Sequence, residues 1–385
     1  MRKVKVAFLD YSFVFAGAER VLFNMIAHID RSKYEPILVF PYPMEHQKRY
    51  LPLDCDKVYL ADRKKWWMGS DKWEHSLRGT DFIKRSEFGR RIAGLIKRKH
   101  IDILDVNLMR MDVMMWVWAT RKFTNARIVG HYRSQSQDWV APAKAQRLFD
   151  VIACVSEFSR MRFRLKGDFT KTVVLYDSVD VDIMKCKKTK SEAKRELGFT
   201  EDTLLLTSVG QLSPHKGHDN AIKAFAKIAA RFPQARLFIA GGGSKQLVDM
   251  YKKIATDCGI ANKVTITGQQ YSDIQTVYRA TDLTLSLTKV GEGFGLVPYE
   301  SALMGTPFIA PCFGAVCEFV TDGENGILVD TNNVNEVSDK IAYALDSLEQ
   351  CGDMVKKLDA MIHDKLHPTV LAKELDKLYT SLLSK

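Results

Sequence analysis

Short apolar runs alternate with amphipathic stretches along the chain, and this alternation is typical of β-α-β units that build parallel sheets. A first series begins with a strand at Val4–Leu9, a helix at Gly17–His28 and a strand at Glu35–Phe40. Further apolar runs continue the same sheet at residues 101–106, 126–130, 151–155 and 173–176. The pattern therefore predicts an α/β domain in the first half of the chain.

A second series of strands follows at residues 204–209, 235–240, 263–267, 283–287, 307–310 and 326–329. Helices are expected between and after them, at 218–231, 244–258, 272–280, 298–304, 314–320, 333–349, 352–363 and 369–384. The Lys-rich stretch 180–200 is the best candidate for a linker. We therefore expect domains at 1–180 and 181–365, and a C-terminal segment, 366–385, that packs back toward the first domain.

The composition is that of a globular protein, since 46% of the 385 residues are hydrophobic and 27% are charged. No apolar run approaches the roughly 18 to 20 residues of a membrane-spanning helix, and the first residues do not have the pattern of a signal peptide. The seven cysteines form no Cys-x-x-Cys pair, although Cys312 and Cys317 could pair or bind a metal. We expect a cytoplasmic protein with reduced cysteines and no bound metal.

The positive charge is confined to the first half. Residues 1–180 hold 33 Lys and Arg against 21 Asp and Glu, a net charge of +12, whereas residues 181–385 hold 24 against 25, a net charge of −1. Such a field attracts nucleic acid, anionic lipid or phosphorylated ligands alike, or serves solubility alone. Trp66 and Trp67 lie beside Arg and Lys, a composition that fits either a membrane interface or a core or acceptor pocket.

The segment from Leu285 to Glu300 reads as a buried strand, a glycine-rich loop and the start of a helix. Glycines at 291, 293 and 295 let the backbone turn tightly and approach a ligand, and free N–H groups at a helix start suit a diphosphate. Glu292 and Glu300 frame the loop. Carboxylates accept hydrogen bonds from sugar hydroxyls, so Glu292 could hold a transferred sugar and Glu300 a ribose, unless Glu300 only complements the helix dipole.

The motif Glu292-x7-Glu300, with Glu-Gly-Phe-Gly-Leu at its start, resembles the signature of family 4 glycosyltransferases, the glycosyl transferases group 1. The loop from Gly210 to Gly217 is similar to the Gly-Arg-Leu-x3-Lys-Gly loop of that family, and 16–20 is similar to its Gly-Gly-x-Glu-Arg loop. The resemblance implies the GT-B fold, two Rossmann-like domains facing each other across a cleft, the first for the acceptor and the second for the nucleotide-sugar.

The resemblance also implies roles for individual residues. Lys216 would meet the donor diphosphate, Glu292 the sugar, and His131 the donor sugar or acceptor near the reacting carbon. Without the resemblance, Lys216 reads as an ordinary solvated lysine and His131 as a satisfied loop histidine. Further donor contacts are expected from the residues Gly17, Gln211, Gln269, Gly293, Phe294, Gly295, Leu296 and Glu300.

Gln211 is the main departure from the family pattern, because the family has an arginine five residues before the loop lysine. Glutamine donates hydrogen bonds but brings no charge. Stabilisation of the leaving diphosphate could therefore be weaker, or Arg20 or Arg133 could supply the missing cation. Arg133, Trp66 and Trp67 are also our candidates for contacts with the acceptor or a membrane.

The resemblance thus implies a retaining, metal-independent glycosyltransferase that moves a hexose-type sugar from a nucleotide-sugar, with a UDP-sugar favoured over GDP-mannose, to a glycan or lipid-linked acceptor. This activity would serve the assembly of cell-surface polysaccharide or glycolipid, with peripheral contact to an anionic membrane. Two alternatives stay open at this stage: a nucleotide-sugar epimerase of similar fold, and a basic, non-enzymatic nucleic-acid-binding protein, for which no known module is recognisable.

Overall fold

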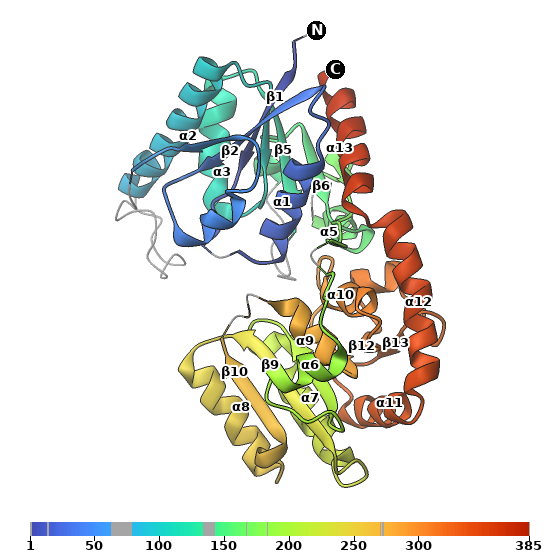
Figure 1. Cartoon of the computed structure of the whole chain (residues 1–385). Coiled ribbons are helices and arrows are strands. Elements are labelled where there is room, and N and C mark those ends of the chain that lie inside the picture. Colours follow the sequence, from blue (N-terminus) through green and yellow to red (C-terminus); the bar gives the residue numbers. More distant parts are fainter. Residues whose placement is uncertain are drawn as a thin grey trace. The chain divides into compact units, whose positions relative to one another are not determined.

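The computed structural model describes residues 2–13, 15–62, 79–133, 143–166, 168–182, 184–269, 271 and 273–384, without the side chains of 79–86, 111–112, 143–144 and 165–166. The chain divides into two compact units (Figure 1). Unit 1 is Met1–Ser178 with Pro368–Lys385, and unit 2 is Val179–His367. The boundaries expected from the sequence, after residues 180 and 365, lie beside these divisions.

Unit 1 is built on a parallel sheet whose described strands follow the order β3-β2-β1-β4-β5-β6-β7. These strands are β1 (Val4–Leu9), β2 (Tyr34–Phe40), β3 (Asp56–Tyr59), β4 (Ile103–Val106), β5 (Arg127–Tyr132), β6 (Val151–Cys154) and β7 (Thr172–Val174). The sequence pattern did not predict β3, because this short edge strand has no buried residue and so shows no apolar run. The other strands correspond to predicted apolar runs.

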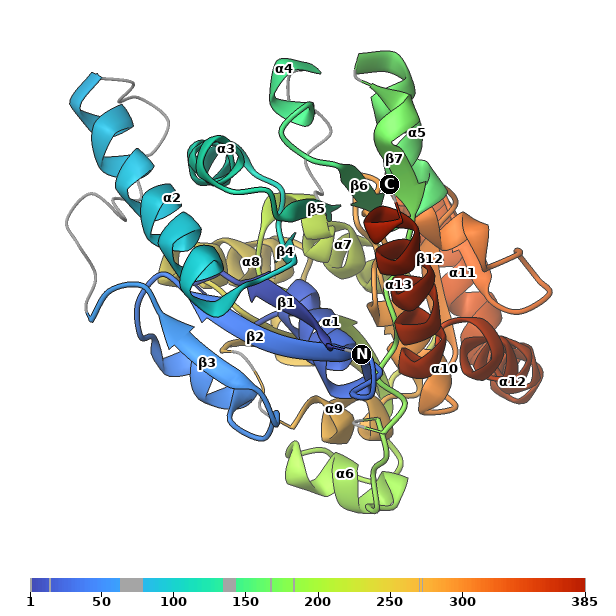
Figure 2. The ribbon, with the colours of Figure 1, turned by 90° about the horizontal axis from the view of Figure 1, so that it is seen from above.

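Both faces of this sheet are covered by helices (Figure 2). Val6 and Phe8 of β1 pack with α1 (Gly17–His28) and α13 (Pro368–Leu383). The alternate residues, Ala7 and Leu9, pack on the other face with helices α2 (Gly79–Lys99), α3 (Met111–Phe123) and α5 (Glu157–Lys166). Strand side chains alternate between the two faces of the sheet, so one strand contributes side chains to two apolar cores. Shorter turns are η1 (Glu45–Tyr50), α4 (Ala143–Gln146) and η4 (Phe169–Lys171).

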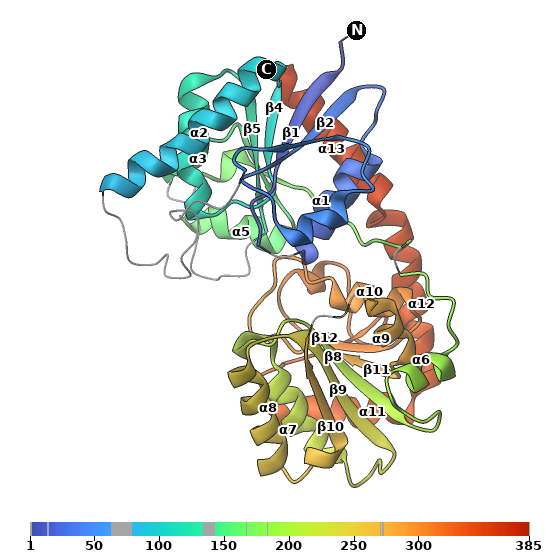
Figure 3. The same ribbon diagram turned by 60° about the vertical axis from the view of Figure 1, so that its left-hand side comes forward.

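Unit 2 has a parallel sheet with the strand order β10-β9-β8-β11-β12-β13 (Figure 3). Its strands are β8 (Leu204–Val209), β9 (Ala235–Gly242), β10 (Val264–Gly268), β11 (Leu283–Leu285), β12 (Phe308–Pro311) and β13 (Ile327–Val329). The main apolar core joins this sheet to α7 (His218–Ile228), α8 (Lys245–Asp257) and α11 (Val334–Asp346). A second cluster lies under α6 (Lys190–Glu196) and α9 (Ile274–Ala280), and α10 (Val297–Leu303) packs on α12 (Leu348–Lys365).

The prediction that residues 180–200 form a linker was wrong for its second half. Helix α6 begins after Thr189, whose hydroxyl accepts from the Glu192 N–H while the Glu192 carboxylate accepts from the Thr189 N–H. This reciprocal capping box starts a helix in a Lys-rich stretch, and the fully buried Ala193 joins it to the core. The helix predicted at 314–320 is also shorter, a 3₁₀ turn, η7 (Ala315–Glu318).

The strand orders decide which loops can share a site. In unit 2, β8 and β11 are hydrogen-bonded neighbours, so the loops that follow them begin side by side at the carboxyl edge of the sheet. In unit 1, β4 and β5 are neighbours in the same way. The residues singled out in the sequence, Lys216, Glu292 and His131, all come from these loops and strand ends.

Candidate functional site

The loop after β8 presents Lys216 at the end of a single 3₁₀ turn, η5 (Pro214–Lys216). Gly217 follows with a φ of 72°, a left-handed conformation that favours glycine. A Cβ at Gly217 would lie 1.7 Å from the carbonyl oxygen of Leu287. Only glycine therefore allows this loop to turn so closely against the loop that follows β11.

The two loops are also joined by hydrogen bonds. The carbonyl oxygen of His215 accepts from the Lys289 N–H at 2.8 Å and from the Thr288 hydroxyl at 3.1 Å. Across this junction the Lys216 ammonium forms an ion pair with the Glu292 carboxylate. The pair thus joins Lys216, which the resemblance assigns to the donor diphosphate, and Glu292, which it assigns to the donor sugar.

The Lys216–Glu292 pair keeps contact with solvent, with side-chain exposures of 19% and 13%. A ligand can therefore reach both groups without unfolding the loops. In this arrangement each charge offsets the other, so the site carries no surplus positive charge from this pair.

Glycines shape the Glu292 loop as well. Gly295 has a φ of 80°, and a Cβ there would lie 2.7 Å from Oε2 of Glu292. A second loop supports this one from the end of β12: a Cβ at Gly314 would lie 3.2 Å from the Cα of Gly291, and the Ala315 N–H donates to the Glu292 carbonyl at 3.5 Å. The backbone around Glu292 is therefore fixed on both sides.

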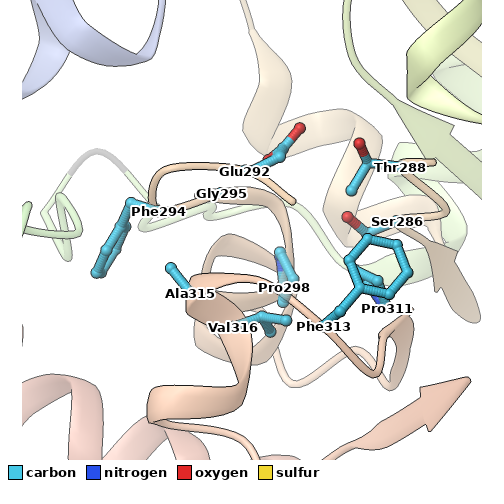
Figure 4. A pocket seen from close by; sticks show the side chains of 10 residues that line it. All are labelled: Ser286, Thr288, Glu292, Phe294, Gly295, Pro298, Pro311, Phe313, Ala315 and Val316. Atoms are coloured by element: carbon cyan, nitrogen blue, oxygen red, sulfur yellow. The ribbon is translucent and has the colours of Figure 1, made fainter. Parts of the chain in front are cut away.

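The loop also borders a small pocket that is open to solvent. It is lined by Ser286, Thr288, Glu292, Phe294, Gly295, Pro298, Pro311, Phe313, Ala315 and Val316. Figure 4 shows Phe294 turned to one side and Phe313 with Ser286 on the other. The Phe294 ring stacks on Tyr299 at 5.0 Å between centroids, so this predicted donor residue also anchors the loop to the core.

Glu300 lies in the first turn of α10 and is only 4% exposed. The Tyr278 hydroxyl, itself buried, donates to Glu300 Oε2 at 2.9 Å. The two glutamates of the motif are therefore held differently: Glu292 pairs with a cation on a loop, and Glu300 is held by a phenol inside the unit. The ribose role of Glu300 stays a prediction.

The Gln211 side chain is exposed, and its backbone carbonyl is hydrogen-bonded to a buried histidine. His218 donates from Nε2 to the Gln211 carbonyl at 3.3 Å, and its Nδ1 accepts from the Ser208 hydroxyl at 2.9 Å. Burial lowers the pKa of His218 to about 4, so the ring stays neutral and its unprotonated Nδ1 accepts from the Ser208 hydroxyl. Gln211 thus offers an amide at the site but no charge.

The other predicted donor residues lie in several parts of the chain. Gln269 is exposed just after β10, with its carbonyl accepting from the Thr267 hydroxyl at 3.3 Å. Gly293 and Leu296 belong to the Glu292 loop. Gly17 is in unit 1, at the first position of α1, where the Glu19 carboxylate accepts from the Ala16 N–H at 2.9 Å.

In unit 1, His131 lies near the end of β5 with a side chain that is 1% exposed. Its Nε2 is 2.9 Å from Oδ1 and 3.0 Å from Oδ2 of Asp105, and Nη2 of Arg133 is 3.3 Å from its Nδ1. A carboxylate oxygen only accepts and a guanidinium only donates, so Nε2 carries the hydrogen and Nδ1 the lone pair. The predicted contact of His131 with a sugar stays a prediction.

Arg133 does not present a spare positive charge in this structure. Its guanidinium forms an ion pair with Asp177, and its side chain is 4% exposed. Its Nε also donates to the Asn107 carbonyl at 3.2 Å. The sequence named Arg133 as a possible replacement for the missing arginine at Gln211, and this pairing with Asp177 argues against that role.

The remaining predictions concern a membrane. Trp66 and Trp67 lie outside the described residues. Within the part of the chain that the structure describes, no helix is both long enough and apolar enough to span a lipid bilayer.

Sequence reasoning missed two residues that touch the predicted site. Asp105 binds His131, and Tyr379, from α13, donates to the same Asp105 oxygen at 2.7 Å. A carboxylate inside the apolar run Ile103–Val106 was the available signal for Asp105, because an isolated charge in a buried strand needs a partner. Tyr379 gave no signal, since an aromatic residue on an amphipathic helix usually belongs to the core.

Known structures share this fold over nearly the whole chain. A glycosyltransferase from Rickettsia africae ESF-5 matches with a TM-score of 0.83 and 16% identity, and the match covers 100% of this chain and 99% of the Rickettsia chain. Anabaena Alr3699/HepE, solved in complex with UDP and glucose, matches with a TM-score of 0.82 and 18% identity, covering 98% and 100%. The two units with parallel sheets therefore have the GT-B fold of glycosyltransferases.

Residues 189–360 match the model of the family described as Glycosyl transferases group 1. This part of the chain lies within unit 2 and holds Lys216 and Glu292, so the match agrees with the resemblance drawn from the motifs.

Curated relatives are named D-inositol 3-phosphate glycosyltransferase. The protein from Mycolicibacterium smegmatis (strain ATCC 700084 / mc(2)155) is 32% identical over 184 residues, 47% of this chain and 41% of the relative. That from Corynebacterium glutamicum (strain R) is 28% identical over 277 residues, 68% and 66% of the two chains. The matched regions thus span less than two thirds of each relative.

Proposed function

We propose that this protein is a retaining glycosyltransferase that moves a hexose-type sugar from a nucleotide-sugar, with UDP-sugars favoured over GDP-mannose, to a glycan or lipid-linked acceptor. The observation that carries the proposal is the Lys216–Glu292 pair. It joins a cation suited to a diphosphate and a carboxylate suited to sugar hydroxyls at the edge of one sheet, inside the segment that matches the family.

The donor would lie along the two glycine-shaped loops of unit 2. Lys216 would bind the diphosphate and stabilise the charge that develops as it leaves. The backbone N–H groups of Gly293–Leu296 would complete that contact, and Glu292, once separated from Lys216, would accept from sugar hydroxyls. Glu300 would bind the ribose, with Gln211 and Gln269 as further polar contacts.

The choice of UDP is supported by the solved relatives. Anabaena Alr3699/HepE has been determined with UDP, with UDP and glucose, and with UDP-glucose. At 18 to 19% identity these structures establish only a shared fold, and we propose that this chain binds UDP as well.

The chemistry that we propose needs no enzymic nucleophile. In a front-face displacement the bond between the anomeric carbon and the diphosphate oxygen breaks while the acceptor oxygen attacks from the same side. The departing phosphate takes the acceptor proton, and the sugar keeps its configuration. Lys216, a fixed cation, would neutralise the charge of the leaving diphosphate in place of a metal ion. We therefore expect activity to survive chelation of divalent ions.

The acceptor would be bound by unit 1, whose sequence carries the excess positive charge. The relatives' name specifies a phosphorylated cyclitol as their acceptor. A phosphorylated or lipid-linked acceptor would suit the positive field of residues 1–180, and a lipid-linked one would bring the protein to an anionic membrane surface in cell-surface polysaccharide or glycolipid assembly.

Binding and product analysis test the proposal together. Thermal shift with UDP, GDP and their sugars identifies the nucleoside, and chromatography of a reaction with the stabilising sugar nucleotide identifies the products. We expect free UDP and a glycosylated acceptor or free sugar, in the presence of EDTA as in its absence. An altered but intact nucleotide-sugar would mean epimerisation, and no stabilisation by any nucleotide would contradict the proposal.

A further inference from the structure

The C-terminal helix of the chain brings a polar side chain to the end of β4 in unit 1. Helix α13 packs against the sheet through Leu371, Leu375 and Leu382, in the same cluster as Val6 and Val129 (Figure 1). Tyr379 lies in this apolar contact and is fully buried. Its hydroxyl donates to Oδ2 of Asp105 at 2.7 Å, a contact across 274 residues of sequence.

The Tyr379 hydroxyl is a donor in this contact. Burial, together with the charge of Asp105, raises the pKa of Tyr379 well above its ordinary value, so the phenol keeps its proton. Asp105 is itself 0% exposed. A buried carboxylate is costly unless donors satisfy it, and Asp105 Oδ2 has two of them, the Tyr379 hydroxyl and Nε2 of His131.

The imidazole of His131 is thereby fixed in orientation and in tautomer. Asp105 accepts a hydrogen bond from the Nε2 N–H, so the hydrogen stays on Nε2 and the lone pair lies on Nδ1. Nδ1 meets Arg133 at 3.3 Å, a long contact that a substrate hydroxyl could replace, whereas the contact with Asp105 is 3.0 Å and Asp105 is 0% exposed. Tyr379 thus acts on the ring atom that remains for a ligand by holding the carboxylate behind it.

We propose that Tyr379 is a positioning residue for His131 in the glycosyl transfer reaction, acting through Asp105. The inference rests on the function proposed above and on the predicted place of His131 near the reacting carbon. Without the phenol hydroxyl, Asp105 keeps one donor instead of two, and its carboxylate is free to turn and carry the imidazole with it. Misplacement of a positioned group slows the chemical step more than it weakens donor binding.

The same helix supplies a matched control. Tyr34 donates to Oδ1 of Asp376, on α13, at 2.8 Å, and its ring meets the Tyr379 ring edge-on with 5.6 Å between centroids. Replacing Tyr34 by Phe removes a hydroxyl from the contact between α13 and the sheet but leaves Asp105 and His131 untouched. If Tyr379 only attaches the helix, both variants should behave alike.

The experiment compares full-length Tyr379→Phe and Tyr34→Phe with the unchanged chain. Release of UDP from UDP-glucose, with water as the acceptor, gives kcat and KM, and selective ¹⁵N-histidine labelling gives the ring nitrogen signals of His131, assigned with His131→Gln. For Tyr379→Phe we expect kcat to fall about tenfold, KM to change less than twofold, and the His131 signals to shift. Tyr34→Phe should keep both kcat and the signals.

Equal losses of kcat in the two variants, or unchanged His131 signals in Tyr379→Phe, would overturn the proposal. If Tyr379→Phe does not fold, Asp105→Asn removes the charge from the other end of the contact, and unchanged kcat in that variant would also overturn it. A wild-type chain that releases no UDP would refute the proposed function instead, while the histidine signals would still decide whether Tyr379 positions the ring.

Discussion

The two polar clusters of this molecule differ in how they are held. In unit 2, Lys216 and Glu292 stand on loops that glycines allow to approach closely, and both side chains remain partly exposed. In unit 1, Asp105, His131 and Tyr379 are at most 1% exposed, and secondary-structure elements hold all of them. The unit 2 pair can therefore open to receive a ligand, whereas the buried unit 1 cluster can only orient a group that touches it.

The largest effect should come from crowding the unit 2 loops. Gly217→Ala places a Cβ 1.7 Å from the Leu287 carbonyl at a φ of 72°, so we expect a loss of roughly 3 kcal/mol or more in unfolding free energy, from strain and overpacking together. Gly259 is the control, because its φ is 71° and no atom lies within 4 Å of a Cβ built there.

Gly259→Ala should then lose only about 1 to 2 kcal/mol, the cost of the left-handed conformation alone. Urea unfolding measures both variants. Similar losses in the two would show that the close approach of the loops to each other is not needed.

The second effect concerns pH and unit 1. Burial and the nearby Glu19 charge raise the pKa of Asp10 from 3.8 to about 7, although the Tyr50 hydroxyl donates to it at 2.8 Å. The folded chain then holds a proton that the unfolded chain releases at lower pH. This contribution to stability is complete below the unfolded pKa and is lost as pH rises toward 7.

Asp10→Asn should remove this loss. Relative to the variant, the wild-type unfolding free energy should fall by about 2 kcal/mol between about pH 5.5 and about pH 7. Urea unfolding of both chains at each pH gives the difference in unfolding free energy. Contributions from other titrating groups, such as His218, are the same in both chains and cancel in this difference. A difference that does not change with pH would contradict the raised pKa.

A smaller effect separates the two glutamates of the motif. Glu300→Gln keeps an acceptor for the Tyr278 hydroxyl but removes the charge, so UDP binding should weaken about tenfold if the carboxylate holds the ribose. Calorimetry with UDP measures it. If Glu292→Gln weakens UDP binding more than Glu300→Gln does, the assignment of ribose to Glu300 is wrong.

The smallest effect concerns α6. Thr189→Ala removes one side of its capping box and should cost about 1 kcal/mol in urea unfolding. Ser244→Ala, at the start of α8, removes a cap whose hydroxyl accepts at a longer 3.4 Å and serves for comparison. An unchanged Thr189→Ala would mean that burial of Ala193 alone holds α6.

Much of the fold was predictable because buried parallel strands are apolar along their whole length. The short, exposed β3 lacked that pattern, and α6 was hidden by its lysines, although Thr189 and Glu192 carried a capping signal. The unit 2 loops were predictable because glycines and carboxylates stand close together in the chain. The Asp105–Tyr379 contact was not, because it joins residues 274 positions apart and only folding brings them together.

Calorimetric titration of UDP into the wild type, Lys216→Met and Glu292→Gln tests the central claim most directly. Removing the Lys216 charge should weaken UDP binding by about tenfold or more, whereas Glu292→Gln frees the ammonium from its partner and should keep or strengthen UDP binding while transfer from UDP-glucose is lost. Unchanged UDP affinity in Lys216→Met, or an equal loss in Glu292→Gln, would contradict the account.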